Sequence, residues 1–141
     1  MMRDGYRLFE HTADIGIEAK GKTLTRAFEE VANGMFSIIT DGSEIESKII
    51  REFKIKADNV EELLVDFLSK LLYYHGAESL VFDSFDLNLN EERLELEVTA
   101  KGEVYDLNKH RYGDEIKGVT YHNLIIEKHK DYSIVRVLFD I

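Results

Sequence analysis

Two short stretches near opposite ends of the sequence carry side chains that could hold a metal ion. The first is EHTAD, residues 10–14, a polar cluster that is not an obvious turn and that ends in Asp14. The second is the end of the apolar run VRVLFDI, where Asp140 precedes Ile141 and its terminal carboxylate. Hard cations prefer oxygen ligands, and a weak site needs two or three carboxylates brought together by the fold. Asp14 is therefore one candidate ligand, and Asp140 with the Ile141 carboxylate is a usable pair of donors.

Each of these stretches also has a purely structural interpretation. Asp14 or Thr12 could cap a turn while His11 forms a local hydrogen bond. Asp140 could simply end a strand in solvent. The residues alone leave the metal hypothesis and these alternatives open.

Further polar residues precede the last apolar runs. His122 has the same parity as Leu124 and Ile126, so we expect it to face inward, where a lone histidine is more often a hydrogen-bonded core residue than a ligand. Residues 103–118 are Gly-rich and charged, which predicts a solvated loop that contains His110 and Lys117. No Ser–His–Asp arrangement or zinc-type spacing stands out.

The string GIEAKGKT, residues 16–23, matches the nucleotide-binding pattern G-x-x-x-x-G-K-[ST]. A phosphate loop needs backbone N–H groups that converge in a turn after a buried parallel strand. Here residues 14–20 alternate apolar and polar, which predicts a strand whose N–H groups point to both sides. We therefore expect a coincidental match, with Gly21-Lys22 as a turn into a helix. The apolar run Val137–Asp140 resembles the run ending in Asp that holds Mg²⁺ in nucleotide-hydrolysing enzymes, so that alternative stays open.

The remaining periodicity predicts the elements that must position these residues. Apolar residues at helical spacing predict a helix that begins after Thr23 and a second one that begins after Asn59 and stops near Gly76. Alternation predicts strands over 49–57, 81–89, 94–100, 119–127 and 132–141, the last four as two hairpins. We predict one α+β domain over residues 1–141: a two-layer sandwich, with a mostly antiparallel or mixed sheet and two main amphipathic helices on one face.

Composition narrows the function classes. The 141 residues have no cysteine and a formal net charge of −10, and Lys and Arg do not gather in one stretch. Direct high-affinity binding to nucleic acid is therefore not expected, whereas an acidic surface suits a basic protein partner, a cation or simple solubility. Because the sequence shows neither a signal-peptide h-region nor a run of 18 apolar residues, we expect a cytoplasmic protein without a membrane segment.

Several longer strings together resemble the archease family. They are FEHTADIGIEAKGKTLTRAFEEVANGMFSIITD, LLVDFLSKLLYYHGAESLVF, GEVYDLNKHRYGDEIKGVTYHNL and the ending RVLFDI, and they span nearly the whole chain. The combination of HTAD, KGVTYH and a terminal FDI is specific to this family. Members often carry an acid at the position of Lys22, so the lysine that completes the nucleotide-loop pattern is not part of the family signature.

The resemblance implies a function and a site. Archeases assist the RtcB-type RNA ligase in tRNA splicing: they promote guanylylation of the ligase, allow multiple turnover and broaden its use of nucleoside triphosphates, without being ligases themselves. The family's metal positions match Asp14, Asp140 and Ile141 through its carboxylate, with calcium the usual divalent ion. Lys117 and His122, in EIKGVTYH, and His11 are expected as neighbours of that site. The alternatives are a chaperone or modulator of proteins in DNA or RNA processing, and a metal-dependent hydrolase that uses residues 11–23.

Overall fold

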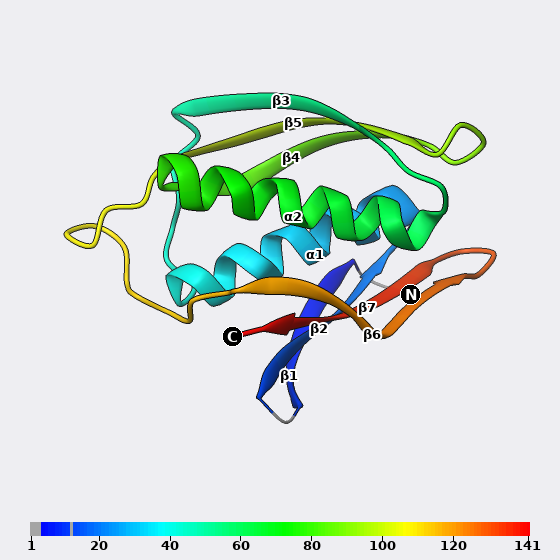
Figure 1. The fold of residues 1–141 in the computed structure, drawn as a ribbon, viewed down its shortest axis with the longest axis horizontal. Helices are drawn as coiled ribbons and strands as arrows, with labels where there is room; N and C mark the ends of the chain where they lie inside the picture. The colour runs from blue at the N-terminus through cyan, green and yellow to red at the C-terminus, as the bar shows by residue number, and fades with distance from the viewer. Residues whose placement is uncertain (1–3, 12) are drawn as a thin grey trace.

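Two helices lie between two antiparallel sheets in the computed structural model of this chain (Figure 1). The structure describes residues 4–11 and 13–141, and for His11 it describes the backbone alone. The described elements are β1 (Gly5–His11), β2 (Asp14–Gly21), α1 (Leu24–Thr40), β3 (Ile49–Lys56), α2 (Val60–Glu78), β4 (Leu80–Asn90), β5 (Glu95–Val104), β6 (Gly118–Lys128) and β7 (Ser133–Asp140).

The first helix begins where the sequence predicts. The Oγ1 atom of Thr23 accepts a hydrogen bond from the Arg26 amide at 3.2 Å, which satisfies one of the unpaired N–H groups at the start of a helix. The helix ends at Asp41, which adopts a left-handed conformation with φ of 51°. Its apolar side chains are buried between the sheets, and α1 contacts β1, β2 and β7 on one side and β4 on the other.

The second helix begins at its predicted cap but ends later than predicted. Asn59 Oδ1 accepts a hydrogen bond from the Glu62 amide at 2.8 Å. Gly76 lies inside the helix, and Ser79, with φ of 56°, is the left-handed residue that follows Glu78. The expected stop at Gly76 is therefore wrong. The glycine's low helix propensity costs about 1 kcal/mol, which the packing of the preceding His75 ring against Phe36 helps to offset.

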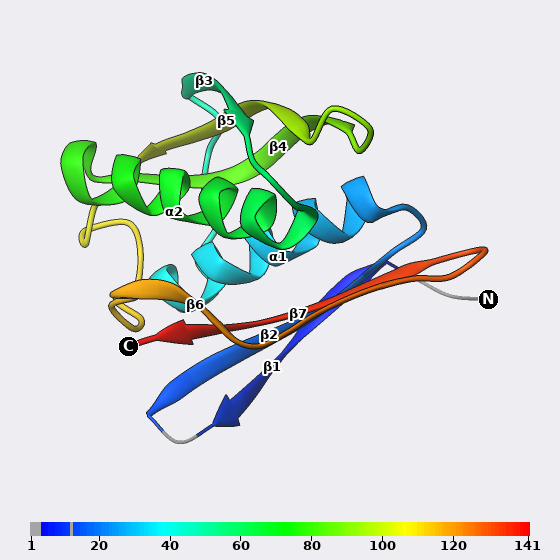
Figure 2. The same ribbon diagram turned by 45° about the vertical axis from the view of Figure 1, so that its right-hand side comes forward.

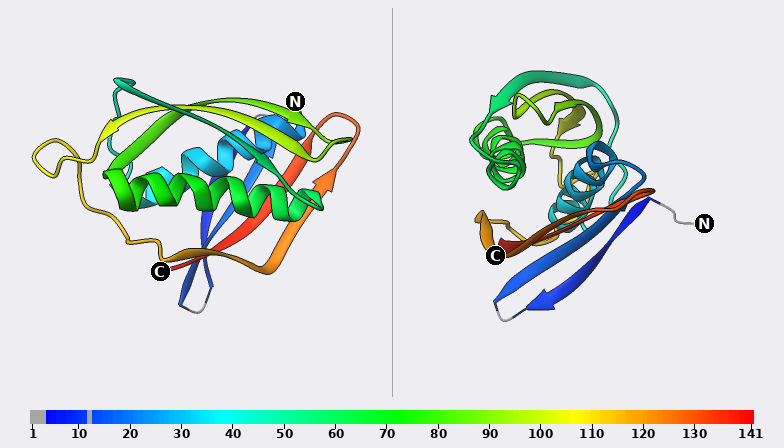
Figure 3. Two further views of the ribbon diagram at one scale, coloured as in Figure 1. Left: turned by 45° about the horizontal axis from the view of Figure 1, so that its top comes forward. Right: turned by 90° about the vertical axis from the view of Figure 1, so that its right-hand side faces the viewer.

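The strands form two separate sheets, seen above and below the helices in the right-hand view of Figure 3. The four-stranded sheet has the order β1-β2-β7-β6, and the three-stranded sheet has the order β3-β5-β4. All described pairings are antiparallel, and both predicted hairpins, β4–β5 and β6–β7, are present. The α+β class and the antiparallel pairing are confirmed. Each sheet carries helices on one face, but two sheets give three layers instead of the predicted two.

The string that matches the nucleotide-binding pattern forms a strand and a turn, as predicted. Residues 16–21 lie in β2, which pairs with β1 on one side and β7 on the other, so its N–H groups cannot converge on one phosphate. The Lys22 amide donates to the Asp4 carboxylate at 2.7 Å. A Cβ atom at Gly21 would lie 2.4 Å from the Ala27 nitrogen, so glycine is required where the strand turns tightly into α1.

Neither of the two helices in the described part of the chain is long and apolar enough to cross a membrane.

Candidate metal site at the edge of the four-stranded sheet

The strand register brings the two predicted metal-binding stretches together. Asp14 is paired directly with Asp140 across β2 and β7, although 125 residues lie between them in the sequence. On either side, His11 of β1 pairs with Asp14, and Gly118 of β6 pairs with Asp140. Figure 2 shows the end of β7, in red, lying along β2 near the tip of the β1–β2 hairpin. One row across the sheet therefore holds Asp14 and Asp140 with the backbone of His11 beside them.

The two aspartates project from the face of the sheet that the helices do not cover. Their neighbours Ile15 and Phe139 face the core, and side chains alternate along a strand. Directly opposed residues of an antiparallel pair have Cβ atoms about 4.5–5.5 Å apart. Asp14 is half-buried and Asp140 is exposed. Two carboxylates held this close repel each other, and a cation between them would offset that repulsion.

Lys117 joins this row through its backbone. Its amide donates to the Asp140 carbonyl at 2.7 Å, directly before β6 begins. The preceding loop is fixed to the end of α1, because the amides of Gly113 and Asp114 donate to the carbonyls of Ile39 and Ile38 at 2.9 and 3.0 Å. A Cβ atom at Gly113 would lie 2.0 Å from the Ile38 oxygen, so the two segments touch at their backbones. The Lys117 side chain itself is exposed.

His122 does not face inward, so that expectation is wrong. The pairing of β6 with β7 shifts between Thr120 and Ile125, and Asn123 has a left-handed φ of 55°. The His122 amide donates to Thr120 Oγ1 at 2.9 Å, and the side chain is exposed. The bulge changes which residues share a face, and period-two counting cannot detect it. The predicted role of His11 concerns a side chain outside the described residues.

A buried polar cluster in the loop before β6 was not foreseen. Glu103 is 5% exposed and His110 is 2% exposed. Glu103 accepts hydrogen bonds from Lys109 Nζ at 2.7 Å, the Glu46 amide at 2.6 Å and His110 Nε2 at 3.0 Å. Burial alone would raise the pKa of Glu103, but these donors outweigh it and lower the pKa to about 2. The loop that we predicted to be solvated is therefore held in place by hydrogen bonds to a buried carboxylate.

The two hydrogen bonds of His110 define its protonation. The Asp106 amide donates to Nδ1 at 3.0 Å, so this nitrogen carries no proton. Nε2 is then the nitrogen that donates to the Glu103 carboxylate. In sequence, Asp106, Lys109 and His110 are indistinguishable from an ordinary charged loop, because their partner Glu103 belongs to the preceding strand β5.

The donor chemistry fits a weakly held, oxygen-liganded cation. Among residues 4–10 and 13–141, no group of three or more His, Cys, Asp or Glu side chains is arranged to hold a metal. Asp14 and Asp140 supply two carboxylates, and Ile141, the third ligand that the resemblance implies, directly follows β7. Oxygen donors of this kind suit Ca²⁺ or Mg²⁺ better than zinc, which prefers nitrogen and sulfur.

Comparisons with known proteins agree with the fold and cover nearly the whole chain. The sequence model of the Archease protein family matches residues 6–141. A protein archease of Sulfurisphaera tokodaii is 42% identical over 136 residues, which is 96% of this chain and 98% of the relative. One from Methanosarcina barkeri is also 42% identical, over 139 residues, with 96% and 95% of the two chains covered.

Two solved structures share the architecture. The solution structure of Methanobacterium thermoautotrophicum protein 1598 superposes with a TM-score of 0.83 at 34% identity, covering 97% of this chain and 99% of that one. A crystal structure from Thermotoga maritima, described as an archease and possible chaperone, gives a TM-score of 0.59 at 26% identity, covering 100% and 98% of the two chains.

Proposed function

This chain belongs to the archease family, and from that premise we propose that it is an accessory activator of an RtcB-type RNA ligase that acts through a bound divalent cation, calcium first among the candidates. The observation that carries the proposal is the direct pairing of Asp14 with Asp140. Membership of the family supports the role of an accessory protein. The paired carboxylates support the binding of a cation.

The chain's own residues would hold the ion and present it. The backbones of Asp14 and Asp140 are fixed by their strands, so little backbone entropy is lost when an ion binds. Ile141, which directly follows β7, is the third ligand that the family resemblance implies. Lys117 enters the same row with an exposed ammonium group, and His122 lies exposed on β6. When bound, the cation would supply positive charge for the phosphates of the nucleotide that guanylylates the ligase.

Electrostatics supports the choice of partner. A chain with a net charge of −10 associates readily with a basic, RNA-binding enzyme, because complementary charge accelerates encounter and fixes orientation. The ion in turn would reduce repulsion between the aspartate pair and a bound nucleotide.

Ligase turnover tests the proposal. Purified RtcB-type ligase, with RNA ends in excess, GTP and metal, would be assayed with and without substoichiometric amounts of this chain, and guanylylated ligase and ligated RNA would be followed. We expect turnover to rise from about one to many. Asp140→Asn should abolish the gain, while Asp86→Asn, an exposed aspartate on the three-stranded sheet, should keep it. If the Asp140→Asn protein activates the ligase normally, the metal has no role in activation.

A second candidate function is that of a chaperone or modulator of proteins in DNA or RNA processing. The Thermotoga maritima relative is described as a possible chaperone. Large apolar side chains are exposed near the loop before β6, namely Val104, Leu107 and Tyr112. Suppression of aggregation of several unrelated unfolded proteins, lost in Leu107→Ser, would favour this function over ligase activation.

A further inference from the structure

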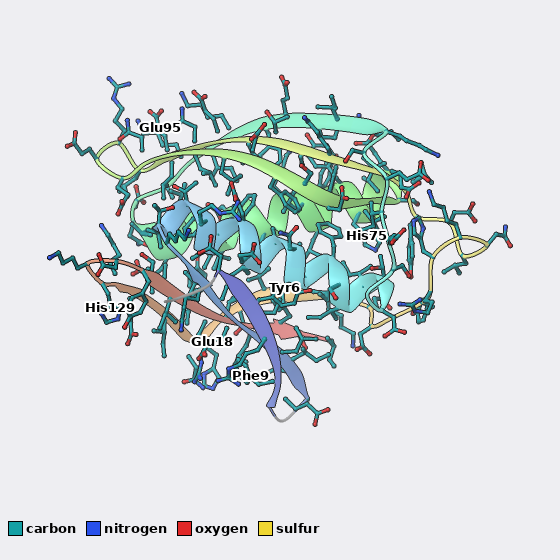
Figure 4. All side chains as sticks on the ribbon, turned by 180° about the vertical axis from the view of Figure 1, so that it is seen from behind. Tyr6, Phe9, Glu18, His75, Glu95 and His129 are labelled. Carbon is teal, nitrogen blue, oxygen red and sulfur yellow. The ribbon has the colours of Figure 1, made fainter. Side chains whose placement is uncertain are left out.

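A second group of charged side chains lies on the same outer face of the four-stranded sheet. Arg7, Glu18 and Arg136 form one row across β1, β2 and β7, because the register pairs Arg7 with Glu18 and Glu18 with Arg136. Glu18 is four residues from Asp14 along β2, which corresponds to about 13–14 Å. Figure 4 labels Glu18 and its neighbour Phe9 on the side of the sheet away from the helices.

In this row two arginines share one carboxylate. Arg7 Nε donates to Glu18 Oε1 at 3.0 Å, and Arg136 Nη2 donates to Oε2 at 2.7 Å. Each guanidinium has five N–H donors, so most of them remain available to a second acceptor. The two side chains are 58% and 35% exposed, which leaves these donors within reach of solvent.

The ring of Phe9 holds both guanidinium groups in place. It lies over Gly16, where an added Cβ atom would be 2.1 Å from the ring carbon Cζ. The guanidinium carbons of Arg7 and Arg136 lie 5.7 and 4.9 Å from the ring centroid, within the range of cation–π attraction. Two like charges are thus held on one ring, and Glu18 balances one of them.

A small hollow opens beside this row. It has a volume of about 250 Å³ and is lined by Arg7, Glu18 and Lys20, with Gly5 and Ile134 among its other walls. This is smaller than the roughly 300–1,000 Å³ that drug-sized ligands occupy. Lys20 belongs to the next row of the same face, where it pairs with Gly5 and Ile134.

We propose that this hollow binds a phosphate group, carried by a nucleotide or by an RNA end. Arg7 and Lys20 line the hollow, and Arg136 lies in the row beside it. Arg7 and Arg136 share the single carboxylate of Glu18, so this row has a surplus of one positive charge in a chain that is otherwise strongly acidic. A phosphate monoester carries close to two negative charges at neutral pH. Arginines bind its oxygens through paired, charge-assisted hydrogen bonds, and here both guanidinium groups are already positioned by the Phe9 ring.

Binding can be measured on the isolated chain without ligase or added metal, so the outcome is separate from that of the turnover assay. Pyrophosphate would be titrated while backbone amide NMR shifts of β1, β2 and β7 are followed. Arg136→Gln should weaken binding about tenfold or more. Lys54→Gln, which removes one positive charge from the outer face of the three-stranded sheet, should leave binding unchanged.

Glu18→Gln provides the sharper control, because it removes the competing carboxylate and should tighten binding by about 2–5-fold. Weaker binding in Glu18→Gln, equal losses in Arg136→Gln and Lys54→Gln, or no shifts with pyrophosphate would each overturn the proposal. Two further titrations distinguish the source of the phosphate. Competition by GTP identifies a nucleotide, and a preference for 5′-phosphorylated over dephosphorylated RNA identifies an RNA end.

Discussion

Asp14 and Asp140 lie opposite each other in adjacent antiparallel strands, on the sheet face that the helices leave open. Such a pair of like charges costs stability by itself, so its presence is informative. Replacing Asp140 would relieve this repulsion. A metal role therefore predicts that substitution of Asp140 raises stability in the absence of the ion and lowers it in the presence of the ion.

Asp140→Asn is therefore expected to raise the free energy of unfolding without metal by about 0.2–1 kcal/mol. With calcium at 100 times its dissociation constant, the unsubstituted chain should gain about 2.7 kcal/mol, and the variant should not. Thermal unfolding with EDTA and with a calcium series checks both parts, with Asp86→Asn as the matched control. A full calcium response in Asp140→Asn would exclude the site.

Glu103→Gln should destabilise the fold by about 2–3 kcal/mol at neutral pH, because it weakens three hydrogen bonds to a buried carboxylate. The pKa of Glu103 is lowered to about 2 from an ordinary value of 4.5. Its contribution is therefore fully present above pH 4.5 and is lost as the pH falls toward 2.

Urea unfolding at pH 7 and at pH 3 measures this difference. The gap between the unsubstituted chain and Glu103→Gln should be smaller at pH 3. A gap that stays constant, or that widens in acid, would show that the charge of Glu103 is not what stabilises the loop.

Gly113→Ala should destabilise the chain by about 1–3 kcal/mol, because its Cβ atom would meet the Ile38 oxygen and push the loop away from α1. The same change at Gly76, inside α2 with open space around it, should instead stabilise by about 0.5–1 kcal/mol. Equilibrium unfolding of the two variants compares them directly. Equal effects at both positions would mean that the close approach at Gly113 is not important.

Lys22→Ala should change neither stability beyond about 0.5 kcal/mol nor nucleotide binding. The exposed residue lies after β2, and its backbone amide, which survives the substitution, makes the contact with Asp4. GTP hydrolysis by the purified chain that disappears in Lys22→Ala would restore the phosphate-loop hypothesis. Unfolding curves recorded in parallel separate that loss from misfolding.

The sequence predicts the parts of the fold that depend on neighbours along the chain. The caps at Thr23 and Asn59 and the alternation in β2 and β3 are local signals, and the structure confirms them. The pairing of β2 with β7 is not a local signal. The resemblance to a known family implied only that Asp14 and Asp140 share a site, and alternation does not say which strand lies next to which.

The features that the sequence did not predict also depend on single residues or on contacts between distant parts of the chain. The bulge at Asn123 turns His122 outward, and a single left-handed residue leaves no trace in periodicity. Residues of the types of Glu103 and His110 are usually expected at the surface. Here both are buried, because they form a hydrogen bond with each other in the interior. Gly76 stays helical because tertiary packing outweighs its propensity.

The order β1-β2-β7-β6 has a consequence for biosynthesis. Its central contact joins two strands that are more than a hundred residues apart, so the four-stranded sheet raises the contact order of the fold. During translation, β1 and β2 emerge first and have no partner on the β7 side until residues 133–140 have left the ribosome. The three-stranded sheet, made within residues 49–104, can form earlier. The aspartate pair therefore forms only after β7 has paired with β2, and the proposed cation site would be absent from the nascent chain until then.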